Sequence, residues 1–312
     1  SHEVPSRMPS SAWKKKKILA IADKNLKSKI KNLKFVRWHL GENYLKAIKN
    51  YDVIIKSPGI PPRIILPFIT NEQKVTSQTE IFLENCPGTV IGITGTKGKG
   101  TTSSLIYKIL KESNLKAHLV GNIGKPVLNL LFSATPRDIY VYEMSSHQLY
   151  NLKKSPHIAV FLNISQAHLD YFKNFREYVR AKSNITKYQQ KGDFLIYNSK
   201  DKIVKDIAQK SKAKKIPISG EFMELNKAAA VAVGNLFGVS SKKITQVFKK
   251  FKPLPHRLEY VGKFKGIEFY DDSAATVPEA ARFALITLGP KVQTMILGGY
   301  ESKVDYSVLA KE

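Results

Sequence analysis

Four near-continuous apolar runs, separated by polar and amphipathic segments, are the main pattern of this chain. They occupy residues 90–93, 139–142, 158–164 and 194–197. Runs of this length with helical segments between them are typical of parallel strands that are buried on both faces. We therefore predict a central α/β domain with a parallel sheet, extending over residues 88 to about 218.

Shorter apolar runs lie on either side of this domain. Residues 18–22 and 53–55 predict two strands of a small N-terminal α/β unit. Residues 267–270 and 295–297 predict two strands of a C-terminal α/β segment, and residues 219–252 have a helical pattern. The expected fold class is thus α/β throughout.

The first strand of the central sheet leads into a glycine-rich loop at residues 95–100, and a helix with an apolar face at residues 105–110 follows. A strand, a glycine loop and a helix N-terminus together form a common phosphate-binding structure, because backbone N–H groups converge and the helix dipole attracts anions. Lys99 would add a positive charge, and Thr101 or Thr102 a hydroxyl for magnesium.

The spacing of this loop differs from the standard phosphate-binding motif. Five residues, rather than four, separate Gly92 from the Gly98-Lys99 pair, and Gly100 replaces the usual Ser or Thr. The alternative is a plain glycine-rich turn between a strand and a helix. We favour phosphate binding, because the strand and the helix both lie where that function requires them.

Polar residues stand at the ends of the predicted strands. Glu143 follows the second strand of the central sheet, where it is either a magnesium ligand or a solvated carboxylate. His168 follows the third strand and is either a metal ligand or a core histidine, and Lys182 has the sequence context of an exposed helix lysine. Residues 57–60, after an N-terminal strand, are either a simple turn or a ligand contact.

Composition places the chain among globular proteins. It has 312 residues, 43% of them hydrophobic, a mean hydropathy of −0.24, and no apolar run near the ~20 residues that span a bilayer. The single cysteine, Cys86, excludes an intramolecular disulfide and fits a reducing compartment. Since no basic-then-apolar leader is present, we expect a cytoplasmic protein without a membrane partner.

The net charge is strongly positive. The chain has 51 Lys and Arg against 25 Asp and Glu, giving +26. This charge indicates either a nucleic-acid-binding face or a solvated, Lys-rich surface. We favour the surface, because only eight of the basic residues are Arg, the residue suited to bidentate phosphate recognition, and the lysines are spread along the whole chain.

Taken together, these motifs resemble the Mur ligase family of ATP-dependent amide-forming enzymes, most closely the branch that adds D-glutamate. The resemblance covers nearly the whole chain, and the motifs occur in family order. The matching segments are residues 57–61, 94–99, 121–124, 143–149, 163–170, 181–182, Asn226, 254–257, 272–276 and 297–299.

The resemblance implies three domains: a UDP-binding domain at residues 8–86, a central ATPase domain at 87–252 and a dinucleotide-fold domain at 253–312. We expect the first domain to lack its first βα unit and the third to be incomplete. A monomer is expected.

The resemblance also implies functional residues. Lys99, Lys182 and His168 would be catalytic, with Lys182 modified to a carbamate. One magnesium would be held by Thr101 and Glu143, and a second by His168 and Lys182. ATP would be bound by Gly95, Thr96, Lys97, Gly98, Lys99, Gly100, Thr101, Thr102, Asn226, Arg257 and Asp272. The UDP-sugar substrate would contact Ser57, Pro58, Gly59, Ile60, Asn122, Ser145, Gln148 and Thr276.

The implied reaction adds D-glutamate to UDP-N-acetylmuramoyl-L-alanine through an acyl phosphate, with ATP as co-substrate. Three positions depart from the family pattern: Phe222 and Met223 replace a His-Asn pair, and Ala274 replaces a lysine. We therefore expect a protein whose activity is weakened or lost. The alternatives are a folylpolyglutamate synthase-like ligase, a basic nucleotide-dependent nucleic-acid-binding protein, and a non-catalytic protein that binds the UDP-sugar.

Overall fold

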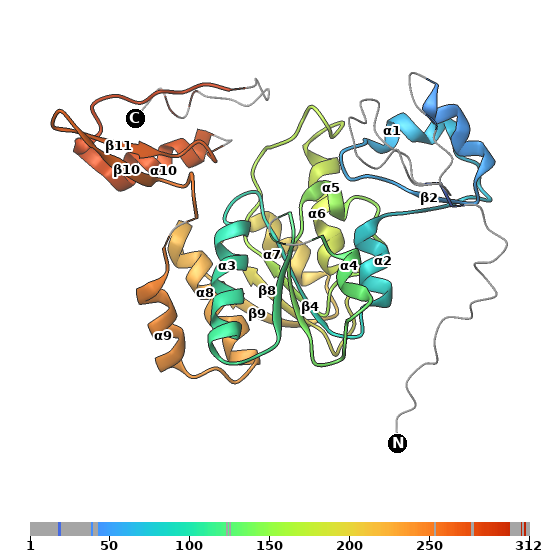
Figure 1. Cartoon of the computed structure of the whole chain (residues 1–312), viewed down its shortest axis with the longest axis horizontal. Helices are drawn as coiled ribbons and strands as arrows, with labels where there is room; N and C mark the ends of the chain where they lie inside the picture. The colour runs from blue at the N-terminus through green and yellow to red at the C-terminus, as the bar shows by residue number, and fades with distance from the viewer. Residues whose placement is uncertain are drawn as a thin grey trace. The chain divides into compact units, whose positions relative to one another are not determined.

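The computed structural model describes residues 18–19, 39, 43–122, 124, 126–252, 254–275, 278–299, 307 and 309. The chain forms two compact units that divide between residues 81 and 82 (Figure 1). Each unit is described by itself below. Of the predicted strand at residues 18–22, only residues 18–19 are described.

The first unit has a three-stranded parallel sheet in the order β1-β2-β3. Its small core is formed by Ile48, Ile54 and Ile65, which are all buried. The strand predicted at residues 53–55 is confirmed. The elements are β1 (Ile18–Leu19), the 3-10 helix η2 (Tyr44–Asn50), β2 (Val53–Ile55), α1 (Pro62–Ile65), η3 (Leu66–Phe68), β3 (Lys74–Thr76) and α2 (Gln78–Asn85), whose last turns belong to the second unit.

The second unit is organised around a six-stranded parallel sheet in the order β5-β6-β4-β7-β8-β9. All neighbouring strands pair in parallel. The four predicted strands form its centre, so this part of the prediction is confirmed. The strands are β4 (Thr89–Thr94), β5 (Ala117–Gly121), β6 (Ile139–Glu143), β7 (Ile158–Phe161), β8 (Phe194–Asn198) and β9 (Lys214–Ile218).

The apolar strands are buried on both faces because alternate side chains enter two different cores. In β6, Tyr140 and Tyr142 point into one hydrophobic cluster, whereas Ile139 and Val141 point into the other. Successive side chains of a strand point to opposite faces of a sheet. Continuous apolar runs therefore replace the alternating pattern of a half-exposed sheet.

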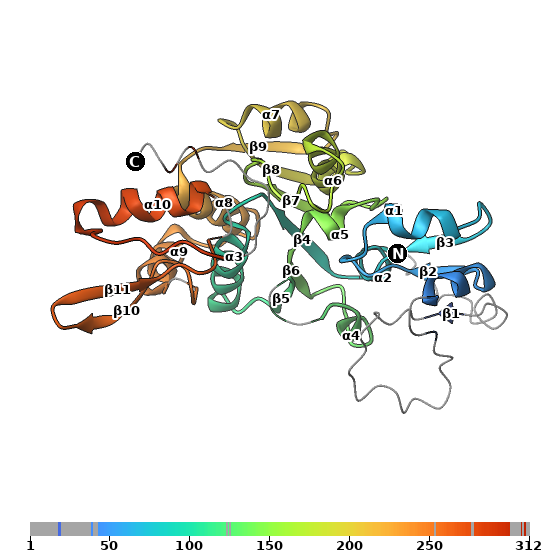
Figure 2. The ribbon, with the colours of Figure 1, turned by 90° about the horizontal axis from the view of Figure 1, so that it is seen from above.

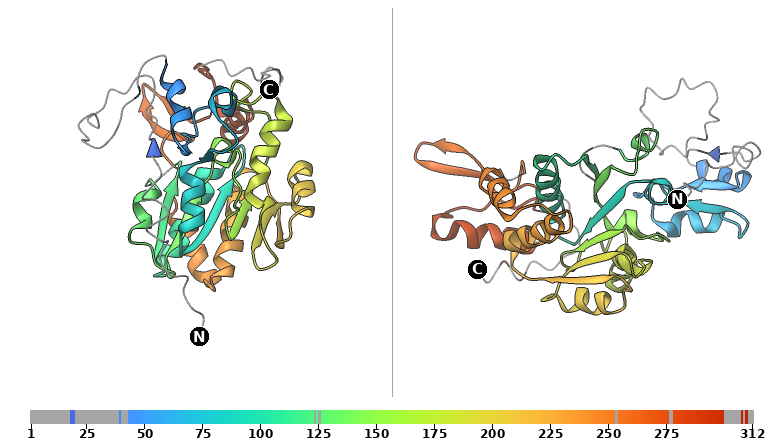
Figure 3. Two further views of the ribbon diagram at one scale, coloured as in Figure 1. Left: turned by 90° about the vertical axis from the view of Figure 1, so that its right-hand side faces the viewer. Right: turned by 90° about the horizontal axis from the view of Figure 1, so that it is seen from below.

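Helices supply the other half of each core. Residues of α3, α8 and α9 pack into one cluster, and residues of α4 to α7 pack into the other. Figure 2 shows the strand order with α3, α8 and α9 on one side, and the right panel of Figure 3 shows the layering from below. The helices are α3 (Lys99–Glu112), α4 (Leu128–Leu131), α5 (Ser146–Leu149), α6 (Phe175–Lys187), α7 (Lys202–Gln209), α8 (Phe222–Leu236) and α9 (Ser241–Lys250). No helix in the described ranges is long and apolar enough to cross a bilayer.

The C-terminal segment differs from its prediction. The strand β11 (Ile267–Asp271) forms as expected, but it pairs antiparallel with β10 (Glu259–Phe264) in a hairpin. Helix α10 (Pro278–Leu288) and η4 (Gly289–Lys291) follow. The strand predicted at residues 295–297 is wrong: these residues belong to no helix or strand, and Ile296 is 93% exposed. A strand requires a neighbour to accept its backbone hydrogen bonds, and no described strand pairs with this run.

Candidate active site

The carboxyl ends of β4, β6 and β7 bring the predicted site residues together. A cavity of about 200 Å³ lies at this edge of the sheet. Ligands of open α/β sheets bind at such edges. Apart from Ala274 and Ala280, every lining residue is one that the sequence predicted for the site. The lining residues are Thr96, Lys97, Gly98, Lys99, Gly100, Asn122, Glu143, His168, Arg257, Ala274 and Ala280.

The glycine loop is held in shape by the segment that follows β7. The backbone N–H of Lys97 donates to Asn163 Oδ1 at 2.8 Å, and Asn163 Nδ2 donates back to the Lys97 carbonyl at 3.2 Å. The Thr96 N–H donates to the Asn163 carbonyl at 2.9 Å. Asn163 was not predicted as a site residue, although its place at a strand end beside the predicted loop is a usable signal.

The Thr96 hydroxyl is part of a second brace. It lies 2.9 Å from the Tyr178 hydroxyl of α6 and accepts a hydrogen bond of 2.9 Å from the Ser165 N–H. Burial raises the pKa of Tyr178 to about 12, so this phenol stays neutral at physiological pH. The loop is therefore tied both to the segment after β7 and to α6.

Gly98 has a conformation and a position that only glycine accommodates well. Its φ of +81° lies in the left-handed region, and a Cβ there would lie 2.4 Å from Asn226 Oδ1. Asn226 Oδ1 accepts a 3.0 Å hydrogen bond from the Thr102 hydroxyl, and both residues are buried. Neither lines the cavity, so both of these predicted ATP contacts support the loop from behind.

The Gly100 position explains why this loop lacks the usual Ser or Thr. A Cβ on Gly100 would lie 3.3 Å from Glu143 Oε2 and 3.2 Å from Leu254 Cδ1. A side chain at this position would press on both neighbours. Thr101 is the next hydroxyl in the chain; it is buried and does not line the cavity.

Lys99 begins α3, and its ammonium group is turned toward the loop. Its Nζ donates to the carbonyl oxygens of Gly95 and Thr96, each at 3.0 Å. Burial lowers the pKa of Lys99, the Glu143 carboxylate partly opposes this, and the Arg257 guanidinium lowers the pKa further. Uncharged carbonyls are weaker acceptors than a phosphate, so this ammonium is available to an anionic ligand.

Lys182 is not the exposed helix lysine that its sequence context suggested. It is 1% exposed, and its Nζ donates to the Gly95 carbonyl at 2.8 Å and lies 3.3 Å from Thr94 Oγ1. Burial, and then the charge of Lys99, lower the pKa of Lys182 well below its usual value. The Glu143 carboxylate partly opposes this lowering of the pKa, but burial is the larger effect and favours the neutral amine.

Glu143 ends β6 and is also buried, so it is not a solvated carboxylate. Its Oε1 accepts a 3.1 Å hydrogen bond from Asn122 Nδ2, while its Oε2 has no hydrogen-bond partner within the part of the chain that the structure describes. A buried carboxylate oxygen without a partner is costly, and at a ligand site it indicates a missing cation or donor.

His168 lies on the cavity wall and is exposed, which excludes the core-histidine alternative. Its φ of +56° is unusual for a non-glycine residue, and its ring centroid lies 4.9 Å from that of His147. Partial burial of the ring, with the ammonium charges of Lys182 and Lys99, lowers the pKa of His168. A neutral imidazole is the form that binds metals.

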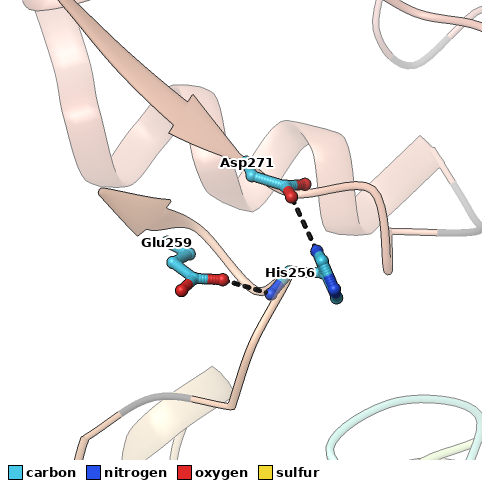
Figure 4. Close-up of side chains that lie close together, drawn as sticks. All are labelled: His256, Glu259 and Asp271. Atoms are coloured by element: carbon cyan, nitrogen blue, oxygen red, sulfur yellow. Dashed lines mark hydrogen bonds and ion pairs between the residues drawn. The ribbon is translucent and has the colours of Figure 1, made fainter. Parts of the chain in front are cut away.

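Arg257 reaches the cavity from a tight turn that leads into the hairpin. Its Nη1 donates to the Ala274 carbonyl at 3.4 Å. As Figure 4 shows, the neighbouring His256 bonds Asp271 through Nδ1 at 2.7 Å and Glu259 through its backbone N–H at 2.7 Å. These bonds fix the turn that presents Arg257.

The cluster of His256, Glu259 and Asp271 was not predicted from the sequence. Its three members are exposed or half-buried, and no other described set of three His, Cys, Asp or Glu residues has its ligand atoms within 4.8 Å of one another. The Asp271 carboxylate raises the pKa of His256, and His256 holds the pKa of Asp271 at about 2. Asp272, a predicted ATP contact, accepts a 2.9 Å bond from the Leu258 N–H and so also stabilises this turn.

The predicted substrate contacts are placed less directly. Ser145 and Gln148 cap α5 by exchanging side chain-to-backbone hydrogen bonds of 2.9 and 3.2 Å. In the first unit, Lys56 is buried and donates to the carbonyls of Ser57 and Ile60, each at 2.9 Å, which stabilises the turn predicted to contact the UDP-sugar. Thr276 lies outside the described residues.

Comparison with known proteins places this geometry in a family context. Residues 93–267 match the model of the Mur ligase middle domain. The chain is 33% identical to the UDP-N-acetylmuramoylalanine--D-glutamate ligase of Acetivibrio thermocellus, with 88% of this chain and 66% of the relative aligned. It is 33% identical to the enzyme of the same name from Clostridium kluyveri, with 97% and 72% aligned. The chain thus spans about two thirds of the length of these relatives.

Solved structures agree at the level of the fold. MurF from Acinetobacter baumannii superimposes with a TM-score of 0.55 at 18% identity, over 75% of this chain and 67% of that one. A bifunctional folylpolyglutamate synthase/dihydrofolate synthase superimposes with a TM-score of 0.53 at 16% identity, over 75% of each chain. At these identities the likenesses show a shared fold and do not separate the D-glutamate-adding branch from the folylpolyglutamate synthase alternative.

Proposed function

This chain belongs to the Mur ligase family of ATP-dependent ligases, and on that premise we propose that it joins D-glutamate to UDP-N-acetylmuramoyl-L-alanine in peptidoglycan precursor synthesis. The choice of D-glutamate rests on the names of the relatives with 33% identity. Within the proposal, the three-domain division at residues 8–86, 87–252 and 253–312 is kept, and the protein acts in the cytoplasm as a monomer.

The observation that carries this proposal is the pair of groups at the loop. The buried Glu143 carboxylate, one oxygen of which no described group bonds, lies against Gly100 at the start of α3, and Lys99 begins the same helix. A helix N-terminus with a lysine attracts phosphate, while a free carboxylate oxygen attracts a hard cation. Binding of a nucleoside triphosphate together with its metal ion requires both features.

The residues present fit one magnesium ion. Glu143 Oε2, which no described group bonds, is the buried atom that such an ion would satisfy, and the Thr101 hydroxyl is the second ligand that the sequence predicts. When bound, magnesium supplies charge neutralisation on the phosphate oxygens. Lys182 as it stands donates hydrogen bonds and does not fit a second ion. A carbamate on Lys182 would present the oxygens that such an ion requires, with His168 as its partner.

The chain's own residues then account for the reaction. Lys99, the loop N–H groups and Arg257 hold the phosphates of ATP and reduce their repulsion of an incoming carboxylate. The alanyl carboxylate attacks the γ-phosphorus, and the bond to ADP breaks, which gives an acyl phosphate. The amine of D-glutamate attacks the acyl carbon, phosphate leaves, and the amine loses a proton.

Substrate orientation is assigned to residues around this edge and in the first unit. Asn122 lines the cavity, and Ser145 and Gln148 follow β6, so they would hold the muramoyl-alanine end together with Thr276. The uracil would contact the turn of Ser57, Pro58, Gly59 and Ile60. Nucleic acid and membranes are not required by this proposal.

The test is ADP formation by the purified chain with a panel of precursors. We expect ADP release to require both UDP-N-acetylmuramoyl-L-alanine and D-glutamate, and to be abolished in Lys99→Met. Lys242→Met, which removes an exposed lysine of α9, is the matched control and is expected to keep the wild-type rate.

Three results would contradict the proposal. Stimulation by a folate and L-glutamate instead would assign the chain to the folylpolyglutamate branch. Binding of the UDP precursor without ADP formation would indicate a non-catalytic binding protein. Lack of any response to the muramoyl precursor would remove the substrate assignment altogether.

A further inference from the structure

The second unit contains another cavity, larger than the one at the phosphate loop. Its volume is about 680 Å³, and it is lined by the outer side of α6, the end of α7 and the turns beside them. It shares no lining residue with the cavity at the loop. Small-molecule sites have volumes of about 300–1,000 Å³.

The lining of this cavity is strongly cationic. Among its described residues, five side chains are basic: Lys173, Arg176, Arg180, Lys187 and Lys210. These charges lie around one concave surface, so their fields add inside it and raise the local concentration of anions.

The single carboxylate of the lining, Glu177, is already engaged. It accepts a hydrogen bond from the Tyr150 hydroxyl at 2.5 Å and one from the Lys173 N–H at 2.6 Å. Arg180 lies 3.9 Å from it, which is at the limit of an ion pair. Glu177 keeps its negative charge, but it stands against five basic side chains, so the lining as a whole remains positive.

The arginines are the most specific part of this arrangement. The whole sequence has eight arginines among 51 basic residues, yet Arg176 and Arg180 stand four positions apart on α6 and both line the cavity. Residues at this spacing lie on the same face of a helix. Guanidinium groups bind phosphate in a bidentate manner, which lysine does not match.

The floor of the cavity is partly apolar. Val179 and Ile207 are half-buried there, and the buried hydroxyls of Thr186 and Ser211 are bonded to each other at 2.7 Å. An apolar floor under a cationic rim suits a compact molecule that carries its charge at one end. It suits a nucleic-acid duplex less well, because a duplex presents its phosphates along an extended rod.

We propose that this cavity between α6 and α7 is a binding site for a small polyanion with at least two linked phosphate groups, held by Arg176 and Arg180. The proposal is independent of the ligase function, because none of these residues belongs to the candidate active site. The opposite side of α6 carries Lys182 and Tyr178. A ligand here thus binds the same helix that braces the phosphate loop.

The test is titration calorimetry with inorganic tripolyphosphate. The titration uses the Lys99→Met variant, because this substitution weakens anion binding at the phosphate loop. The heat of binding that remains then reports on the cavity between α6 and α7. We expect one site, and at least tenfold weaker binding when Arg176→Gln and Arg180→Gln are combined. The matched control combines Lys249→Gln and Lys250→Gln at the exposed end of α9, which removes the same charge, and is expected to keep the affinity.

A second variant keeps the test decisive if the arginine variant folds poorly. Lys187→Gln with Lys210→Gln removes two other cations of the rim and is expected to weaken binding severalfold, with an unchanged thermal transition. Equal losses in the α9 control would show that only the general surface charge attracts the anion. Absence of a site in the Lys99→Met background, or displacement of tripolyphosphate by a short DNA duplex, would also overturn the proposal.

Discussion

The two ends of strand β6 carry two buried carboxylates with opposite surroundings. Asp138 directly precedes the strand and is 1% exposed, and Glu143 ends it and is 3% exposed. The four residues between them are all buried residues of the strand, so the two carboxylates share one sequence context and differ in their partners. One end of the strand is built for stability and the other for a ligand.

Asp138 is fully satisfied. It accepts hydrogen bonds from the Thr135 N–H at 2.8 Å, from Lys116 Nζ at 3.0 Å and from His118 Nε2 at 2.6 Å. Burial alone would raise the pKa of Asp138, but the bonds from Thr135, His118 and Lys116 outweigh it and hold the pKa well below its usual value. The charge is stabilised by the protein itself.

Among the side chains that the structure describes, Glu143 is bonded by the Asn122 amide alone, on one of its two oxygens. Its charge is balanced by no described ion pair, although it lies close enough to the amino groups of Lys99 and Lys182 to raise the pKa of each. Burial alone therefore does not distinguish a structural carboxylate from one that binds a ligand. The state of its second oxygen separates a structural carboxylate from one that waits for a partner.

The largest expected effect is on catalysis at the Glu143 end. Glu143→Gln keeps the shape and the Asn122 contact but removes the charge that would hold the metal. Loss of a metal's several kcal/mol of transition-state stabilisation corresponds to a decrease in kcat/KM of at least about 100-fold. The free energy of unfolding is expected to stay equal or to rise, because an unpaired buried charge is removed. ADP formation and urea unfolding measure the two quantities.

Asp138→Asn is the reciprocal experiment and is expected to have the second-largest effect. It removes a buried charge that three groups bond, so the free energy of unfolding should fall by about 2–4 kcal/mol. Activity per folded molecule should remain at the wild-type level, because Asp138 lies at the amino end of β6, whereas the phosphate loop lies at the carboxyl ends of the strands. Loss of activity at unchanged stability would show that the two ends of β6 are not separable.

A glycine pair sharpens the same comparison with a smaller effect. A Cβ on Gly88 would lie 2.4 Å from the backbone oxygen of Asp138, whereas a Cβ on Gly98 would lie 2.4 Å from the side-chain oxygen of Asn226. Backbone moves less easily than an amide side chain. Gly88→Ala should therefore lower the free energy of unfolding by about 1–3 kcal/mol and leave nucleotide affinity unchanged.

Gly98→Ala is expected to affect nucleotide binding more than folding. The left-handed φ at this position costs an alanine about 1 kcal/mol, and displacement of Asn226 would break its bond to Thr102. Fluorescence titration with ATP and urea unfolding of both alanine variants measure the contrast. If both variants lost nucleotide affinity and unfolding free energy in the same proportion, the division between a structural end and a ligand-binding end of the strands would be contradicted.

The centre of the sheet was predictable from the sequence, but its edges were not. The strands β4, β6, β7 and β8 are apolar runs because they are buried on both faces. The edge strands β5 (Ala117–Gly121) and β9 (Lys214–Ile218) were missed, because most of their residues are half-buried or exposed and their sequences carry polar side chains. An edge strand is defined by its neighbour's hydrogen bonds more than by its own composition.

Candidate site residues that directly follow a strand could be predicted from the sequence. Those that lie on helices were harder to predict. Glu143 and the loop are found by their places at strand ends. The burial of Lys182 follows from its place in the buried stripe of α6, with Tyr178, Ala181 and Ile185, and this helical spacing was a signal that the charge obscured. The brace by Asn163 depends on pairing between distant segments, which no local pattern encodes.

The smallest expected effect is the pH dependence of the Asp138 contribution. Because the folded pKa is lowered, the stabilisation by Asp138 is fully present above its unfolded pKa of 3.8 and is lost as the pH falls below that value. The difference in unfolding free energy between wild type and Asp138→Asn should thus be constant from pH 7 to 5. Between pH 5 and 3 it should shrink by about 0.5–1 kcal/mol, with solvent screening of the Lys116 charge taken into account.

Urea unfolding of both proteins across this range measures the difference, and the general effect of the +26 charge cancels between them. A difference that grew toward acid pH would mean that Asp138 is protonated more easily in the folded state, and the contrast with Glu143 would then fail.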